Sequence, residues 1–379
     1  MKEYQVALPY FSDKDISWIQ ENVGHVLRGR LSTGPYTKEF EEKFAKRIGC
    51  KYALFVNNCT TALEISVKNF DLKEDDEVIV PVQTFIASGM AVTSNGGKVV
   101  FAEVNPKTFN LSLEEVKVRT TDKTKGVILV HFAGNVSPDT LMIRKYCNEN
   151  DLFLIEDCAH APGASIEGQS VGTIGHTGCF SFFSTKVITT GEGGMLTTNS
   201  EEIYNYSKAL RERGRSLTNP VEIYDYGWRS GRVPEVSALL GLSQLSHLDE
   251  WLDHRNQIAK IYNSILAESL DVHTINTPKN VFNAYWKHIT IIDNNDIDRE
   301  VLSKSLKDDF GININWAYMP PLHLQPVYRK MYDTNKGDFP ISEDIMSKHF
   351  HLPMQVTISL KDANFIAESV LTVLDRLKA

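Results

Sequence analysis

Short runs of β-branched, aliphatic and aromatic residues alternate with amphipathic helical stretches from residue 50 onward. The runs read as strands, and the stretches between them, such as "TLMIRKYCNEND", have helical periodicity. Strands that are joined by helices pair in parallel, and the helices cover both faces of the sheet. The alternation therefore predicts a mainly parallel sheet of about seven strands. They lie at residues 52–56, 77–81, 98–104, 126–132, 152–156, 179–183 and 194–198.

The pattern changes after residue 234. Residues 234–270 carry apolar side chains at helical spacing after a proline start, which predicts one long helix leaving the large domain. The sequence then predicts a strand at 285–292 and a terminal helix at 360–378. We therefore expect a large α/β domain with an N-terminal arm at residues 1–245. The long helix and a small α+β domain would occupy residues 246–379.

Charge and hydropathy exclude several classes of protein. The net charge of -8 argues against a binder of nucleic acid, although a local group of Arg and Lys can still hold a small anion. No run of about 18 apolar residues is present, and the start "MKEYQVALPYF" lacks a charged leader before an apolar core. We expect a cytoplasmic protein that binds neither membranes nor nucleic acid.

The cysteines and histidines carry no metal-site spacing. The five cysteines form an odd, widely spaced set without a CxxC pair, so reduced and mostly buried thiols are predicted. The eleven histidines lack an HExxH pattern. We expect neither disulfides nor a metal site.

Chemically useful residues follow several of the predicted strands. In open α/β sheets ligands bind at the carboxyl ends of the strands. There the chain places Asp157, the turn "NNCTTAL" (57–63), "VQTF" (82–85) and "STK" (184–186). A carboxylate, a hydroxyl-rich helix start, an aromatic ring and a lysine are the parts that hold pyridoxal phosphate.

Each part has a physical role in such a site. The Lys186 amine can form a Schiff base with the cofactor aldehyde and later shuttle a proton. Asp157 would pair with the pyridinium nitrogen. Thr60 and Thr61 open a helix whose free N–H groups suit a phosphate dianion, and Phe85 offers a flat face to the pyridine ring.

Taken singly, these residues have plainer explanations. A lysine after a strand is usually a solvated surface residue, and an aspartate there is often a cap or a turn residue. Phe85 alone would be a core residue, and "NNCTT" alone a helix start. Their joint arrival at the strand ends of one sheet favours the cofactor site. His160 stays open between a packed core histidine and a group that touches the cofactor's phenolic oxygen.

Several motifs resemble, in order and spacing, the DegT/StrS-type sugar aminotransferases of the fold-type I pyridoxal phosphate enzymes. The resemblance runs from about residue 8 to the C-terminus. The motifs are "LSTGPYTKEFEEKFAKRIGC", "PVQTFIASGMAV", "LIEDCAHAPGA", "FSFFSTKVITTGEGGMLTTN", "GWRSGRVPEVSALLGLSQL", "MPPLHLQPVY" and "HLPM". The resemblance implies an aspartate-aminotransferase-like α/β fold. It further implies transfer of an amino group, commonly from glutamate, to a keto group of a nucleotide-linked deoxysugar. It also implies a homodimer whose sites lie at the subunit interface.

The resemblance carries roles to individual residues. Lys186 corresponds to the Schiff-base lysine, Asp157 to the pyridinium partner and Phe85 to the stacking ring. The residues implied at the phosphate are Thr60, Thr61 and Ser181, and His160 stands where the family has Gln or His beside the ring. The segments around Thr33 and around Tyr318 to His323 resemble those near the substrate mouth, so Thr33, Tyr318 and His323 are the expected substrate contacts.

Two positions depart from the family pattern. Cys59 stands where a Gly usually precedes the phosphate-binding Thr. Gly227 stands where an Asn usually reaches the phosphate of the partner subunit. We predict that Arg229 takes over part of that contact, since Arg forms charge-assisted bonds to phosphate.

Three alternatives remain open at this stage. The family includes sugar 3-dehydratases in which His replaces the lysine, and Lys186 favours transamination over that reaction. A cofactor-bound regulator without turnover is a second alternative, against which the intact Lys186 and Asp157 weigh. Amination of a cyclitol is a third.

Overall fold

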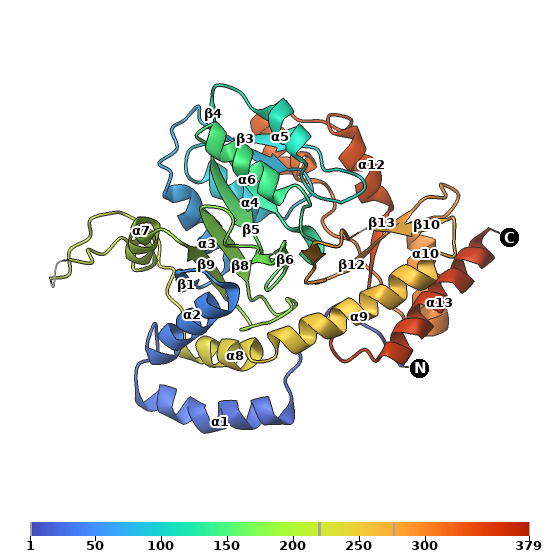
Figure 1. The fold of residues 1–379 in the computed structure, drawn as a ribbon, viewed down its shortest axis with the longest axis horizontal. Helices are drawn as coiled ribbons and strands as arrows, with labels where there is room; N and C mark the ends of the chain where they lie inside the picture. Colours follow the sequence, from blue (N-terminus) through green and yellow to red (C-terminus); the bar gives the residue numbers. More distant parts are fainter. Residues whose placement is uncertain (1, 219–220, 276, 379) are drawn as a thin grey trace.

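The computed structural model describes residues 2–218, 221–275 and 277–378. Its centre is a seven-stranded sheet with the order β1-β9-β8-β5-β4-β2-β3 (Figure 1). The strands are β1 (Tyr52–Val56), β2 (Glu77–Pro81), β3 (Lys98–Ala102), β4 (Thr124–Val130), β5 (Phe153–Asp157), β8 (Thr177–Ser181) and β9 (Gly194–Thr198). This confirms the mainly parallel seven-stranded sheet, with the predicted strands 126–132 and 179–183 each placed two residues earlier in the chain.

One strand runs against the others. β9 is antiparallel to both of its neighbours, β1 and β8, while β8, β5, β4, β2 and β3 pair in parallel. Since two reversals restore the direction, β1 points the same way as β8. The carboxyl ends of β1, β2, β4, β5 and β8 therefore meet at one edge of the sheet.

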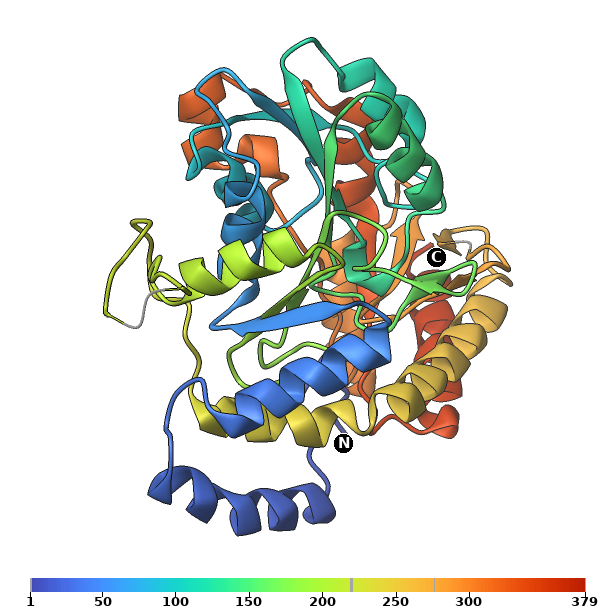
Figure 2. The same ribbon diagram turned by 60° about the vertical axis from the view of Figure 1, so that its left-hand side comes forward.

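Both faces of the sheet are covered, and the side chains alternate between them (Figure 2). Leu54 and Val56 pack on the face that α3 and α4 cover, while Ala53 and Phe55 pack on the opposite face with α2 and α8. α5 and α6 extend that second face around Ile143. The helices are α1 (Asp13–Arg28), α2 (Pro35–Ile48), α3 (Cys59–Lys68), α4 (Ile86–Thr93), α5 (Leu113–Arg119), α6 (Thr140–Glu149), α7 (Glu201–Arg211) and α8 (Glu235–Leu245).

The single long helix predicted for 234–270 is wrong. The segment forms α8 and then α9 (Leu248–Leu266), which point in different directions (Figure 1). The last turn of α8 tightens, because Ser246 N and His247 N bond to carbonyls three residues earlier. His247 Nε2 lies 2.8 Å from Asp15 Oδ1 of α1, which holds the chain at the break.

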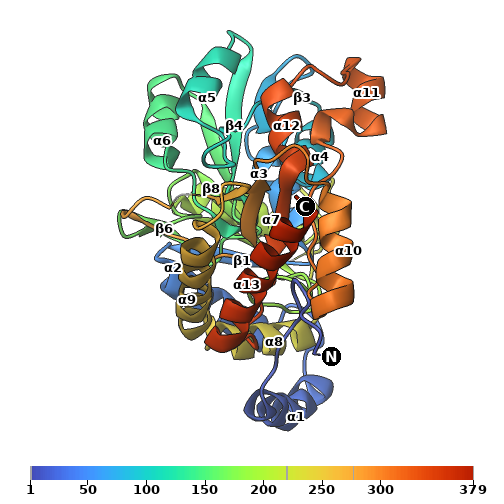
Figure 3. The ribbon, with the colours of Figure 1, turned by 90° about the vertical axis from the view of Figure 1, so that its right-hand side faces the viewer.

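The C-terminal part has its own core around a three-stranded sheet of order β10-β12-β13. α13 lies beside α9 and α10 (Figures 1 and 3). The N-terminal Tyr4 joins this core. The elements are β10 (Val272–Thr274), β12 (His288–Ile292), α10 (Arg299–Phe310), α11 (Pro326–Tyr332), α12 (Pro340–Lys348), β13 (His349–Leu352) and α13 (Leu360–Leu377). The predicted terminal helix is confirmed.

The remaining elements are short. β11 (Val281–Phe282), β6 (Ser165–Ile166) and β7 (Gln169–Ser170) form a small sheet, and 3-10 turns occur at Phe132–Gly134 and Leu322–Leu324. No helix among the described residues is both long enough and apolar enough to span a bilayer.

Candidate active site

A cavity of about 470 Å³ lies at the carboxyl-terminal edge of the large sheet. It receives residues that follow β1, β2, β5 and β8, together with residues of the C-terminal part. Of the predicted site residues, the cavity brings together Thr60, Phe85, Asp157, His160, Ser181, Lys186 and Tyr318.

Lys186 reaches the cavity from the loop between β8 and β9. Its Nζ lies 4.0 Å from the centroid of the Trp286 ring. Burial removes water from around the ammonium and lowers the pKa of Lys186 from 10.5 to about 7. The nearby Lys287 charge also lowers it. The side chain is therefore a neutral, nucleophilic amine in a large fraction of molecules at neutral pH.

Asp157 closes β5 and is buried. Its Oδ2 accepts a hydrogen bond from Ser88 Oγ at 2.8 Å, and its Oδ1 accepts one from Ala159 N at 3.1 Å. Burial raises the pKa of Asp157, while these two donors oppose the rise. A buried carboxylate with few partners favours a cationic ligand. The protonated ring nitrogen of pyridoxal phosphate is such a cation.

One end of the cavity is lined by the start of α3 and suits an anion. Asn58 caps α3, with its Oδ1 accepting from Thr61 N, and Asn58, Cys59 and Thr60 line the cavity. The N–H groups at a helix start favour an anion. Thr60 and Ser181 line this end, whereas Thr61 does not line the cavity. Cys59 is the first residue of α3 and also lines it.

Aromatic rings form the walls. Phe85 is half exposed, and its ring lies 5.2 Å from that of Tyr318. His160 is stacked on Trp286 with a centroid distance of 3.9 Å. Burial lowers the pKa of His160, so the ring is neutral. Because His160 Nδ1 accepts from Ala133 N, the proton sits on Nε2, which donates to the Tyr318 hydroxyl at 3.2 Å.

Besides Thr61, three predicted site residues do not line the cavity. Arg229 pairs with Glu64, its Nη1 lying 3.0 Å from Oε1. His323 is fully buried and its Nε2 lies 3.1 Å from Glu343 Oε1. Thr33 lies beside the start of α2 and does not line the cavity. The expected roles of these residues remain predictions.

Two residues that line the cavity, Trp286 and Lys287, are not among the predicted site residues. The predicted strand at 285–292 includes both residues, but β12 begins at His288, so Trp286 and Lys287 precede it. The Trp286 indole N–H donates to Thr185 O at 2.6 Å, which fixes the ring beside the lysine loop. An aromatic–basic pair at the start of a strand was the available sign.

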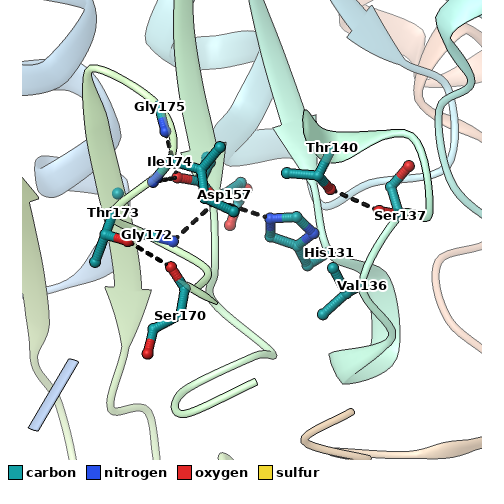
Figure 4. A network of polar contacts seen from close by, with 12 residues as sticks. His131, Val136, Ser137, Thr140, Asp157, Ser170, Gly172, Thr173, Ile174 and Gly175 are labelled. Atoms are coloured by element: carbon teal, nitrogen blue, oxygen red, sulfur yellow. Dashed lines mark hydrogen bonds and ion pairs between the residues drawn. The ribbon is translucent and has the colours of Figure 1, made fainter. Parts of the chain in front are cut away.

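One group of residues has the composition of a metal site. The ligand atoms of His131, Glu156 and Cys158 lie within 4.8 Å of one another, and all three residues are buried. The Glu156 carboxylate, however, already accepts from the backbone N–H groups of Gly172, Ile174 and Gly175 and faces His131 Nε2 at 3.2 Å. Figure 4 shows His131 on one side of this network and the three amides on the other. We interpret it as the anchor of the 172–175 loop.

Comparisons with known proteins agree with this arrangement. Residues 14–371 match the sequence profile of the DegT/DnrJ/EryC1/StrS aminotransferase family. The chain is 35% identical over 365 residues to the uncharacterized protein MJ1066 of Methanocaldococcus jannaschii, covering 93% of each chain. It is 32% identical over 374 residues to the GDP-perosamine synthase of Escherichia coli O157:H7, covering 98% of each.

A solved structure of a sugar aminotransferase in its PLP-form has the same fold. The PLP-form of the putative sugar aminotransferase Spr1654 from Streptococcus pneumoniae superposes with a TM-score of 0.89 at 25% identity, covering 99% of this chain and 100% of that one. The cavity supplies a lysine amine, a buried carboxylate and an anion-binding helix start, which fit pyridoxal phosphate. The chain belongs to the DegT/DnrJ/EryC1/StrS family and is a pyridoxal phosphate-dependent aminotransferase.

Proposed function

We propose that this enzyme transfers an amino group from glutamate to a keto group of a nucleotide-linked deoxysugar. The observation that carries the proposal is the Lys186 amine, with its lowered pKa, in a cavity shared with Asp157. The relationship to GDP-perosamine synthase supports the nucleotide-linked substrate.

The residues that line the cavity would each hold a different part of the cofactor. When bound, pyridoxal phosphate withdraws electrons from the carbon that loses a proton. Asp157 would hold the ring nitrogen protonated, and the α3 amides with Thr60 and Ser181 would hold the phosphate. Phe85 and His160 would flank the ring. Lys186 would hold the cofactor aldehyde and then carry the proton between substrate atoms.

The proton carrier needs a pKa close to the working pH. Burial brings the pKa of Lys186 to about 7, so its amine can both accept and return a proton at neutral pH. An unperturbed lysine would stay protonated and could not act as a base. The presence of Lys186 also supports amino transfer over dehydration.

The assembly and the division of the chain belong to the same proposal. We place the enzyme in the cytoplasm as a homodimer with shared sites, and divide it at residue 245 into a large cofactor-binding domain and a small C-terminal domain. Exposed apolar side chains support a subunit contact: Phe85 and Phe183 line the cavity, Met90 lies on α4, and Ile16 and Trp18 lie on α1.

The test is a panel of keto-sugar nucleotides that vary in base and keto position. Each is incubated with the purified enzyme, pyridoxal phosphate and glutamate, and amino-sugar nucleotides are identified by mass spectrometry. Wild-type enzyme should aminate at least one member, and Lys186→Ala none. A cofactor band that glutamate does not bleach, together with no amination of any panel member, would favour a regulator without turnover. Bleaching without amination of any panel member would favour a different acceptor, such as a cyclitol.

A further inference from the structure

Lys287 is a second lysine in the cavity wall, and no role described above uses it. It lies between Trp286 and the first residue of β12 and is 6% exposed. Its Nζ lies 4.4 Å from the Trp286 ring centroid, and Lys186 Nζ lies 4.0 Å from the same centroid. One indole ring therefore adjoins both amines.

The Lys287 ammonium has few partners. Its Nζ donates to Asn315 Oδ1 at 3.1 Å, and among the described residues no carboxylate lies within ion-pairing distance of it. His351 Nδ1 also lies 3.2 Å from Asn315 Oδ1, so the acceptor is fixed in place. An ammonium has three donors. The remaining donors of Lys287 are free to face the cavity that the side chain lines.

A buried cation without a counter-ion is costly, and a bound anion would offset that cost. Desolvation lowers the pKa of Lys287 to about 8, so most molecules still carry the charge at neutral pH. The Lys287 charge lowers the pKa of His160, His351 and Lys186, whereas no acid among the described residues raises the pKa of Lys287, although Asp157 and Glu192 line the same cavity. The surroundings therefore favour an anionic ligand.

We propose that Lys287 binds a carboxylate of the amino donor. This inference rests on the proposed transfer of an amino group from an amino acid. The α-carboxylate of such a donor is bonded to the carbon that carries the nitrogen, so it must lie close to the reacting amine. Lys287 meets that requirement because it shares the Trp286 ring with Lys186.

The other anions of the reaction fit this position less well. The cofactor phosphate belongs with the α3 amides, Thr60 and Ser181, which follow β1 and β8. The diphosphate of a sugar nucleotide is separated from the reacting keto carbon by part of the sugar ring. A charge next to the reacting amine therefore matches the donor carboxylate.

The test measures binding without turnover. Glutarate has the carboxylates of glutamate but no amine, so its dissociation constant on the holoenzyme reports carboxylate binding alone. Lys287→Met should raise that constant by about tenfold or more, since a charged hydrogen bond is lost. Lys287→Arg should restore most of the affinity, and Lys287→Gln serves if the Met variant does not fold. Lys279→Met, an exposed lysine outside the cavity, is the matched control and should leave it unchanged.

Nucleoside diphosphate affinity and cofactor content are measured on the same variants, and both should stay close to wild type. Unchanged glutarate affinity in Lys287→Met and Lys287→Gln would overturn the inference, as would a wild-type enzyme that binds no glutarate. A loss confined to cofactor or nucleotide affinity would assign Lys287 to that ligand instead. Glutarate binding through Lys287 in an enzyme that aminates no sugar would contradict the proposed function and leave this inference standing.

Discussion

At the scale of single residues, the protein controls protonation through burial. Lys186, Lys287 and His160 are all shifted toward their neutral forms by the loss of solvent. Asp157 is also shifted toward its neutral form, and a cationic ring nitrogen next to it would reverse that shift. The cavity therefore combines an available amine with a carboxyl group suited to a positively charged ligand.

The lowered pKa of Lys186 predicts how the cofactor-free protein captures an aldehyde. The neutral amine is the nucleophile, so the rate of covalent attachment of pyridoxal phosphate should rise with pH up to about 7 and then level off. Stopped-flow absorbance at several pH values measures this rate, and borohydride trapping with peptide mapping checks that Lys186 is the site. A rate that keeps rising toward the ordinary lysine value of 10.5 would contradict the assignment.

Asp157→Asn preserves the shape of the side chain but removes the charge that a protonated ring nitrogen needs. The rate of amino transfer should fall on the order of a thousandfold, which is about 4 kcal/mol of transition-state stabilisation. Steady-state kinetics at saturating cofactor measure the effect, with cofactor content as the control. A variant within about tenfold of wild type would remove Asp157 from this role.

At the scale of elements, strand order explains how the site is assembled. Asp157 and Ser181 are the last residues of β5 and β8, and Thr60 follows β1, which points the same way. These positions were predictable because each depends on local strand pattern and on the rule that ligands bind at strand ends. Trp286 and Lys287 were not, because only the packing of the C-terminal part brings them to the cavity.

The break between α8 and α9 could not be predicted from the sequence for a similar reason. Helical spacing of apolar residues continues through Ser246 and His247, so periodicity predicts no interruption. Contacts of His247 and Ser243 with Asp15, more than 200 residues away, hold the break. Such long-range contacts override local helical preference.

Glu235 links α8 to α2, so we expect its substitution to lower the stability of the fold. It is fully buried at the start of α8, and its carboxylate accepts from the N–H groups of Gly34, Tyr36 and Thr37 at the start of α2. Glu235→Gln places an amide against those donors. The free energy of unfolding should fall by about 2 kcal/mol or more in urea denaturation. The exposed Glu268→Gln is the control, with an expected change below about 0.5 kcal/mol. Equal stability of the two variants would show that the Glu235 cap contributes little.

At the scale of the whole molecule, exposed apolar residues predict a dimer. Residues 212–218 and 221–226, between α7 and α8, extend away from the body (Figures 1 and 2), and Leu217, Ile223, Tyr224 and Tyr226 are all more than 40% exposed. Analytical ultracentrifugation should give twice the mass of one 42.8 kDa chain. A monomer at micromolar concentration that transfers amino groups at full rate would contradict shared sites.

Substitution of Arg229 is a second test of whether the two subunits share their sites. Its side chain is 64% exposed and pairs with Glu64 within the chain, so it is available at a subunit contact. If it helps to hold the partner's phosphate, Arg229→Ala should raise the cofactor dissociation constant by roughly tenfold to a hundredfold. Fluorescence titration of the cofactor-free dimer measures it. An unchanged constant would leave Arg229 with its intrachain ion pair alone.

The most direct measurement follows the nitrogen itself. Glutamate with an isotopically labelled amino group is incubated with the holoenzyme and each keto-sugar nucleotide of the panel in turn. The label should appear on the sugar carbon that carried the keto group of at least one of them, and no label should appear on the sugar with Lys186→Ala. Absence of label from every sugar nucleotide, while glutamate still converts the cofactor to its amine form, would contradict the proposed amino transfer to a sugar.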